Sequence, residues 1–284
     1  MSDRSDFFVS TADLAEALGD PRLRIVDGSW YMPVQNRDAG AEHVERRLPG
    51  AVRFDIDAVA DTSSPLPHML PSAEAFAAAV GAMGISDGDR IVIYDGAGLL
   101  SAPRVWWTFR LFGARDVKIL DGGLPAWVAE GRPTESGAPS APEPATFQAH
   151  LEAARVASLH DVVAVLAEGS ADVVDARPAD RFHGVAPEPR AGISSGHMPG
   201  AINVPAVNII EDGRLTDEDG LREAFEDVDL DKPILTTCGS GVTASILWLA
   251  LETLGVPRGR LCLYDGSWTE WASTPGAVIE KVER

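Results

Sequence analysis

The sequence has few cysteines, few positive charges and no long apolar run, and each shortage excludes a class of protein. Its 284 residues include 2 cysteines, Cys238 and Cys262, too few for a disulfide framework. No apolar stretch approaches the length of a membrane span, and the polar, acidic start at 1–6 does not resemble a signal peptide. No close-spaced set of cysteine and histidine suggests a metal site. We therefore expect a cytoplasmic protein that needs neither a metal nor an organic cofactor.

Positive charge is the largest shortage. The chain has 24 Lys and Arg against 43 Asp and Glu, which gives a formal net charge of −19. A surface of that sign repels nucleic acid and anionic membranes, so neither is expected as a partner. If the substrate is an anion, arginines must gather at its binding site against the field of the whole molecule.

Recurring motifs divide the chain into two similar halves. Four motifs of the first half return in the second, in the same order and at nearly constant offset: 24–27 and 172–175, 48–51 and 198–201, 93–98 and 236–241, 121–123 and 265–267. This pattern indicates a duplicated domain. A proline-rich segment between the halves predicts a stiff, extended connector rather than a packed element. We expect domains at 1–131 and 151–284, joined by a linker at 132–150.

Each half alternates short apolar runs with segments of helical pattern. The apolar runs, typical of buried strands, lie at 23–26, 91–94, 117–120, 173–175, 234–237 and 261–264. The helical patterns lie at 11–18, 72–83, 103–112, 158–168, 219–225 and 244–254. This alternation predicts an α/β fold in which each half holds a mostly parallel sheet with helices on both faces. Ligands of such sheets bind beyond the carboxyl ends of the strands.

The segment 234–245 places a cysteine at such an end. Cys238 follows a predicted strand, opens a glycine-rich turn and precedes a predicted helix. The glycines let the backbone curl so that successive N–H groups point at one spot, and the helix start adds its positive dipole end. This environment favours the thiolate, the nucleophilic form; the alternative is a small core residue. The N–H groups of the expected cradle belong to Gly239, Ser240, Gly241, Val242, Thr243 and Ala244.

The first half carries Asp95 at the position that Cys238 occupies in the second. A carboxylate cannot act as a thiol nucleophile, so we expect the chemistry to take place in the second half alone. The first domain would then be non-catalytic and would cover the cleft or lend side chains to it.

The tandem halves, the cysteine loop in the second half only, and the motif Tyr-Asp-Gly-Ser-Trp at 264–268 resemble the two-domain rhodanese family of sulfurtransferases. The resemblance covers nearly the whole chain. It implies two tandem rhodanese-like domains, and a cysteine that takes up a sulfur atom as a persulfide and passes it to an acceptor. The neutral Gly239 and Ser240 resemble the 3-mercaptopyruvate sulfurtransferase branch, because thiosulfate-using members carry basic residues just after the cysteine.

Arg181 and Arg190 supply the local positive charge that an anionic substrate needs. They lie in the segment 181–190, which also resembles the mercaptopyruvate branch. The resemblance implies that they hold the substrate's carboxylate and keto oxygen. Guanidinium groups suit this task because they bind carboxylates through two parallel hydrogen bonds. The alternative is a pair of exposed loop arginines.

The resemblance also implies a proton relay built from Asp57 and His68 of the first half and Ser240 of the second. Such a relay needs an acid that orients a histidine, and a hydroxyl beside that histidine. It would move protons as the substrate thiol is activated and pyruvate leaves as its enol. The alternative is a solvated histidine in a proline-rich loop.

These residues together predict a two-step transfer of sulfur. Cys238 would take sulfur from 3-mercaptopyruvate, release pyruvate, and pass the sulfur to cyanide or to a thiol, which the family suggests is a small thiol or thioredoxin. Two other functions stay open, a thiosulfate sulfurtransferase and a non-catalytic sulfur carrier or binding module. A related phosphatase would need an arginine that closes the loop, where this chain has Ala244.

Several positions depart from the family pattern or stay unassigned. Leu100 stands where members of the family have a tyrosine, and Ser245 replaces a second cysteine, so no disulfide is expected in the loop. Arg104 could face the cleft or solvate a helix. His197 is expected to have a structural role in its turn. Most tryptophans are expected in the core, namely Trp106, Trp107, Trp127, Trp248, Trp268 and Trp271.

Overall fold

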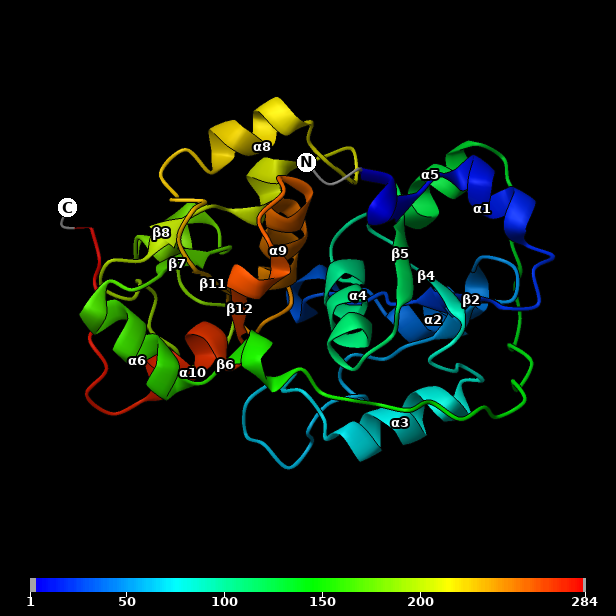
Figure 1. The fold of residues 1–284 in the computed structure, drawn as a ribbon, viewed down its shortest axis with the longest axis horizontal. Helices are drawn as coiled ribbons and strands as arrows, with labels where there is room; N and C mark the ends of the chain where they lie inside the picture. The colour runs from blue at the N-terminus through cyan, green and yellow to red at the C-terminus, as the bar shows by residue number, and fades with distance from the viewer. Residues whose placement is uncertain (1–3, 283–284) are drawn as a thin grey trace.

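The structure is a computed structural model that describes residues 4–282, so residues 1–3 of the acidic start lie outside it, as do 283–284. Two α/β domains follow one another along the chain (Figure 1). The strands of the first sheet are β1 (Phe8–Val9), β2 (Leu23–Asp27), β3 (Val52–Arg53), β4 (Arg90–Tyr94) and β5 (Asp116–Leu120). Those of the second are β6 (Val156–Ala157), β7 (Asp172–Asp175), β8 (Ile202–Asn203), β11 (Ile234–Thr237) and β12 (Leu261–Tyr264).

Both sheets are parallel and share one topology. Within residues 4–282, the first five-stranded sheet has the order β1-β5-β4-β2-β3 and the second has the order β6-β12-β11-β7-β8. Strands that hold the same place in the two sheets also hold the same place in the two halves of the sequence. The matching order confirms the duplicated α/β domain that the recurring motifs predict.

Helices cover both faces of each sheet. In the first domain they are α1 (Thr11–Ala17), α2 (Ala39–Glu45), α3 (Ala73–Ala82), α4 (Ala102–Leu111) and α5 (Gly123–Ala129). In the second they are α6 (Leu159–Glu168), α7 (Ala179–Phe182), α8 (Glu218–Ala224), α9 (Ala244–Thr253) and α10 (Ser267–Ser273). Serine caps start several of them, as at α6, where Ser158 and Asp161 form a capping box.

The helices take opposite faces because alternate residues of a strand point to opposite sides. In β4, Ile91 and Ile93 pack in the core that contains α3 and α4. Val92, between them, packs in the other core with Leu14 of α1 and Trp127 of α5. The sheet is therefore buried on both sides, as its continuous apolar strands predict.

The two domains share one apolar core at their interface. Helices α4 and α9 lie side by side between the two sheets (Figure 1). Trp107 and Trp248 meet there edge to face, with ring centroids 6.0 Å apart. Arg110 and Glu252 close the interface with an ion pair of 2.6 Å. The six tryptophans assigned to the core are all at most 6% exposed, which confirms that prediction.

A hairpin of the second domain lies on the first. Strands β9 (Ile210–Glu211) and β10 (Arg214–Leu215) pair antiparallel, and the turn between them packs on the loop after β4. A Cβ atom at Gly98 would lie 2.6 Å from the Cα of Gly213, so the two backbones are in direct contact. Arg214 forms an ion pair with Asp121 of the first domain. The loop of the first domain that corresponds to the cysteine loop is therefore covered.

The connector at 132–150 has no helix or strand, but the prediction that it is not packed is wrong. It runs along α3 (Figure 1), and Phe147 is 4% exposed in the core of the first domain. The ring of Phe147 lies 5.4 Å from that of Phe76. Burial of one aromatic side chain outweighs the polar, proline-rich composition of the segment.

Truncation of Phe147 to alanine should therefore destabilise the first domain. Loss of a buried phenylalanine removes its transfer free energy and leaves a cavity, so we expect the free energy of unfolding to fall by about 3–5 kcal/mol. Urea denaturation followed by tryptophan fluorescence measures this. The control is Leu151→Ala, because Leu151 is 41% exposed, and its effect should stay below about 1 kcal/mol. Equal effects of the two substitutions would show that the connector is not part of the core.

Candidate active site at the domain interface

The predicted nucleophile lies in the turn between β11 and α9. Cys238 begins this turn and is 2% exposed. The carbonyls of Cys238 and Gly239 accept hydrogen bonds from the N–H groups of Trp268 and Thr269 of α10, at 2.9 and 3.1 Å. A trans peptide points its carbonyl and its N–H in opposite directions. The amide groups of Gly239 and Ser240 therefore face away from α10.

The amide groups of the turn are unpaired. The N–H groups of residues 239–244 make no hydrogen bond with any residue in the range 4–282. Gly241 permits this course because its φ is 81°, and a Cβ atom there would lie 2.8 Å from Nη1 of Arg104. The result is a row of consecutive donors next to the cysteine, at the positive end of α9.

The first domain shows what such a turn binds. The carboxylate of Asp95 fills the equivalent turn between β4 and α4, and it is fully buried. One oxygen of Asp95 accepts the N–H of Ala97, and the other accepts the N–H groups of Leu100, Ser101 and Ala102, all at 2.8 Å. This turn is therefore an anion site occupied by its own side chain. The same turn around Cys238 holds no carboxylate, so its donors are available to a sulfur anion.

The first domain brings Asp57 and His68 to this turn. Nδ1 of His68 lies 3.0 Å from Oγ of Ser240, and Nε2 lies 2.9 Å from a carboxylate oxygen of Asp57. His68 is 6% exposed and has a φ of 61°, a left-handed conformation that is uncommon for a side-chain-bearing residue. The hydrogen bond with His68 is the main reason that the pKa of Asp57 lies below its usual value. The three residues named for a relay are thus in contact.

Trp30 supports the same acid and was missed in the sequence. Its indole N–H donates to the second oxygen of Asp57 at 3.1 Å. Its ring packs edge to face on the imidazole of His68, with centroids 4.9 Å apart. Trp30 follows β2 at the carboxyl end of the sheet, where ligand sites form, and this position was the only available signal.

Arg104 does not solvate its helix but faces the second domain across the interface. Its guanidinium lies 2.7 Å from Asp265 of the second domain, and both side chains are under 5% exposed. Arg104 also donates to the carbonyls of His68 and Gly241, at 2.7 and 3.3 Å. Asp265 accepts the N–H of Leu70 at 2.7 Å. This buried ion pair fastens the loop that carries His68 onto the cysteine turn.

Both predicted substrate arginines lie beside the cysteine turn. Nη2 of Arg181 is 3.2 Å from the place where a Cβ atom of Gly239 would be. Arg190 is half-buried and forms no ion pair within residues 4–282. Burial lowers the pKa of Arg190 and the positive charge of Arg181 adds to the lowering, whereas the negative charge of a Cys238 thiolate acts to raise it. The expected positive charge is therefore assembled at this point, although the molecule as a whole is acidic.

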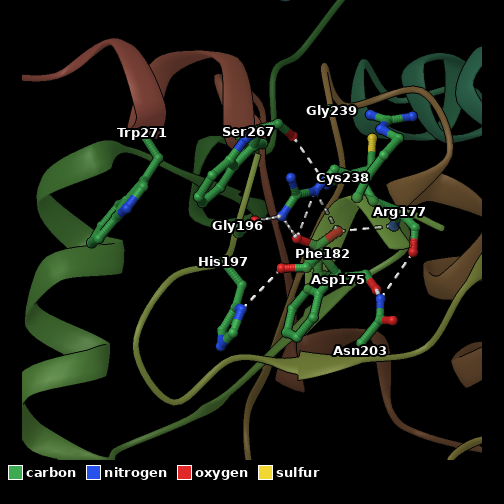
Figure 2. A network of polar contacts seen from close by, with 12 residues as sticks. Asp175, Arg177, Phe182, Gly196, His197, Asn203, Cys238, Gly239, Ser267 and Trp271 are labelled. Atoms are coloured by element: carbon green, nitrogen blue, oxygen red, sulfur yellow. Dashed lines mark hydrogen bonds and ion pairs between the residues drawn. The ribbon is translucent and has the colours of Figure 1, made fainter. Parts of the chain in front are cut away.

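A buried ion network adjoins Arg181, and Figure 2 shows the part of it around Asp175 and Arg177. Arg177 donates to both carboxylate oxygens of Asp175 and to the carbonyl of Gly196. Glu188 connects Arg177 to Arg181. Sequence reasoning missed this network, because charged residues in a proline-rich segment are usually exposed.

The C-terminal residues brace the segment that carries the arginines. His197 exchanges backbone hydrogen bonds of 2.9 Å with Glu280, and its ring stacks on Phe182 at 4.2 Å. These contacts agree with the structural role expected of His197. Within residues 4–282, no group of three or more His, Cys, Asp or Glu side chains is placed to hold a metal ion, and no helix has the length and apolarity to cross a membrane.

Comparison with known proteins gives one consistent family. A family model described as a rhodanese-like domain matches residues 10–130 and 158–274. The 3-mercaptopyruvate sulfurtransferase of Escherichia coli K12 is 42% identical over 280 residues, 98% of this chain and 99% of that protein. The thiosulfate sulfurtransferase of Rattus norvegicus is 45% identical over 273 residues, 93% and 91% of the two chains. The crystal structure of SseA from Escherichia coli, described as a 3-mercaptopyruvate sulfotransferase, has a TM-score of 0.84 at 42% identity and covers 92% of this chain and 98% of its own.

Asp265→Asn should destabilise the interface between the domains. The substitution leaves the buried guanidinium of Arg104 without its counter-ion, and we expect the free energy of unfolding to fall by about 3 kcal/mol or more. The control is Glu218→Gln, which breaks an exposed pair with Arg222 and should cost less than about 1 kcal/mol. Urea denaturation measures both. An effect of Asp265→Asn as small as that of the control would argue against a fastening role for the pair.

Proposed function

This chain belongs to the rhodanese family, with one rhodanese-like domain in each half, and on that premise we propose that it is a 3-mercaptopyruvate sulfurtransferase. The observation that carries the proposal is the turn at Cys238, where unpaired amide groups and two arginines surround one buried thiol. Near full-length similarity to curated 3-mercaptopyruvate sulfurtransferases supports it. We propose domain boundaries at 1–131 and 151–284, with the linker at 132–150.

In the first step, the thiolate of Cys238 attacks the sulfur of 3-mercaptopyruvate. A sulfur–sulfur bond forms and the carbon–sulfur bond breaks, with its electron pair passing to the carbon as the enolate of pyruvate. The proton of the substrate thiol ends on that carbon, so the products are pyruvate and a deprotonated persulfide. Arg181 and Arg190 hold the carboxylate and keto oxygen, where they also stabilise the negative charge of the enolate.

We propose that Asp57, His68 and Ser240 move this proton. The contacts of 2.9 and 3.0 Å give a continuous path from the acid through the imidazole to the hydroxyl. Ser240 lies in the same turn as the cysteine, two residues after it, and would pass the proton between the imidazole and the reacting groups. Asp57 orients the imidazole, and Trp30 holds Asp57 by its second oxygen.

In the second step, a nucleophile removes the outer sulfur and regenerates the Cys238 thiolate. Until then, the amide groups of Gly239, Gly241, Val242 and Thr243 stabilise the persulfide charge. Cys238 is almost fully buried, and a persulfide carries its terminal sulfur about 2 Å farther out. The acceptor therefore needs to reach only that outer atom. We propose a small thiol or thioredoxin as acceptor, with cyanide as a laboratory substitute.

Thiosulfate is the competing donor. The 45% identity to the rat thiosulfate enzyme means that overall similarity does not separate the two activities. The neutral side chains after Cys238 support mercaptopyruvate, because a dianion such as thiosulfate would gain from basic groups there. A non-catalytic binding module would have no use for a relay in contact with the thiol turn.

Two free cysteines and no disulfide among the described residues support a cytoplasmic location.

The donor assignment is tested by a comparison of donors with intact-mass detection. We expect wild-type protein exposed to 3-mercaptopyruvate to gain one sulfur atom and release pyruvate, and Cys238→Ser to do neither. The kcat/KM for mercaptopyruvate should exceed that for thiosulfate. A higher kcat/KM for thiosulfate would make the protein a thiosulfate sulfurtransferase, and an unchanged mass with both donors would favour the binding module.

The relay is tested by His68→Gln. Loss of a positioned acid–base group typically costs about 10²–10⁴ in rate, so kcat/KM for mercaptopyruvate should fall by that factor. Transfer of sulfur from persulfide-loaded protein to cyanide should change far less, because the donor step alone needs the substrate proton to move. The control is His150→Gln, since His150 is exposed and lies in the connector between the domains. If kcat/KM of His68→Gln decreased by less than about threefold, His68 would be excluded from proton transfer.

A further inference from the structure

Glu188 is a buried carboxylate that lies between two guanidinium groups. Its side chain is 4% exposed. One oxygen accepts a hydrogen bond from Arg177 at 2.8 Å, and the other accepts from Nη2 and Nε of Arg181 at 2.6 and 3.1 Å. Burial of a carboxylate is unfavourable unless the carboxylate is paired. Glu188 can be buried here because both of its oxygens are paired with guanidinium groups, unlike an exposed surface ion pair.

Glu188 is itself held by the sheet. Asp175 is the last residue of β7, and it binds Arg177, which is 1% exposed. The guanidinium of Arg177 also lies over the ring of Trp268, 4.1 Å from its centre. Figure 2 shows the hydrogen bonds that hold Arg177 to Asp175 and Gly196. Arg181 lies on the short helix α7, but Glu188 and Arg177 connect its guanidinium to Asp175 at the end of β7. The sheet therefore fixes the orientation of Arg181.

This contact decides which donors of Arg181 remain available. Glu188 occupies the edge formed by Nε and Nη2, whereas Nη1 makes no hydrogen bond with any residue of the described range. Nη2 is also the atom that lies against Gly239. Arg181 is thus fixed next to the cysteine turn with part of its fork free, which is the state that a substrate-binding group needs.

Glu188 also sets the charge of the site. Asp175 and Glu188 balance Arg177 and Arg181, whereas Arg190 has no ion-pair partner among the described residues. The other acid near Arg190 is Asp57, which is already in contact with His68 and Trp30. Coulomb energy is proportional to the charge of the ligand. One unit of charge at position 188 therefore acts about twice as strongly on a dianion as on a monoanion.

We propose that Glu188 is a positioning residue that orients Arg181 and sets the preference of the site for monoanionic donors. The inference rests on the proposed function, in which Arg181 and Arg190 bind the donor. Mercaptopyruvate carries one negative charge and thiosulfate carries two. The carboxylate of Glu188 cancels the positive charge that would otherwise draw in the dianion.

Two substitutions separate charge from geometry. Glu188→Gln keeps the length of the side chain but removes its charge, so the ratio of kcat/KM for thiosulfate to that for mercaptopyruvate should rise at least about tenfold over wild type. Glu188→Asp keeps the charge but shortens the side chain. Its KM should rise at least about fivefold for both donors, with kcat and the donor ratio within about twofold of wild type.

Glu218→Gln is the matched control, because it removes one carboxylate from an exposed ion pair and should change neither KM nor the ratio. Thermal unfolding of each variant separates loss of function from loss of fold. Equal losses on both donors in Glu188→Gln, or an unchanged KM in Glu188→Asp, would overturn the proposal. Every ratio is taken against wild type, so a wild-type preference for thiosulfate would refute the donor assignment without removing this test.

Discussion

The turn of consecutive main-chain N–H groups after the central strand is the constraint on which the rest of the structure depends. Donors that point at one place need an anion or water, because an unpaired buried N–H is unfavourable. The two domains meet this need in different ways. Asp95 fills the turn of the first domain with its own carboxylate. Cys238 leaves the turn of the second domain open and places a sulfur atom beside it.

The open turn becomes a site only because the domains cross over one another. The segment after β3 carries Asp57 and His68 from the first domain onto the second. The equivalent segment after β8 carries the β9–β10 hairpin from the second domain onto the first, where Gly213 contacts Gly98. The segment after β3 brings Asp57 and His68 to the cysteine turn, and the β9–β10 hairpin covers the turn that Asp95 already fills. The ion pair of Arg104 with Asp265 holds the first crossing in place.

The repeated core was predictable from sequence because its strands and helices are long enough to show their periodicity. Strands β11 and β12 have the predicted bounds, and the six predicted helices differ from those observed by one residue at one or both ends. The four helices that were not predicted, α2, α5, α7 and α10, have seven residues or fewer. Strands of two residues, such as β1 and β8, carry no periodicity and were missed. Phe147 was missed because one buried ring in a polar segment does not change its composition. Arg104 and Glu188 were left unassigned because only tertiary structure reveals whether a charged side chain has a buried partner.

The shared core between α4 and α9 has a consequence for the modularity of this protein. Single-copy domains can be cut out, duplicated or fused because their apolar surface is closed and their residues act within one unit. Here Trp107 and Trp248, one from each domain, meet in the apolar core that the two domains share. Separation would expose both to water and would also divide the groups around the thiol. The two halves are thus permanently associated, because the first half supplies part of the shared core and part of the groups around the thiol of the second.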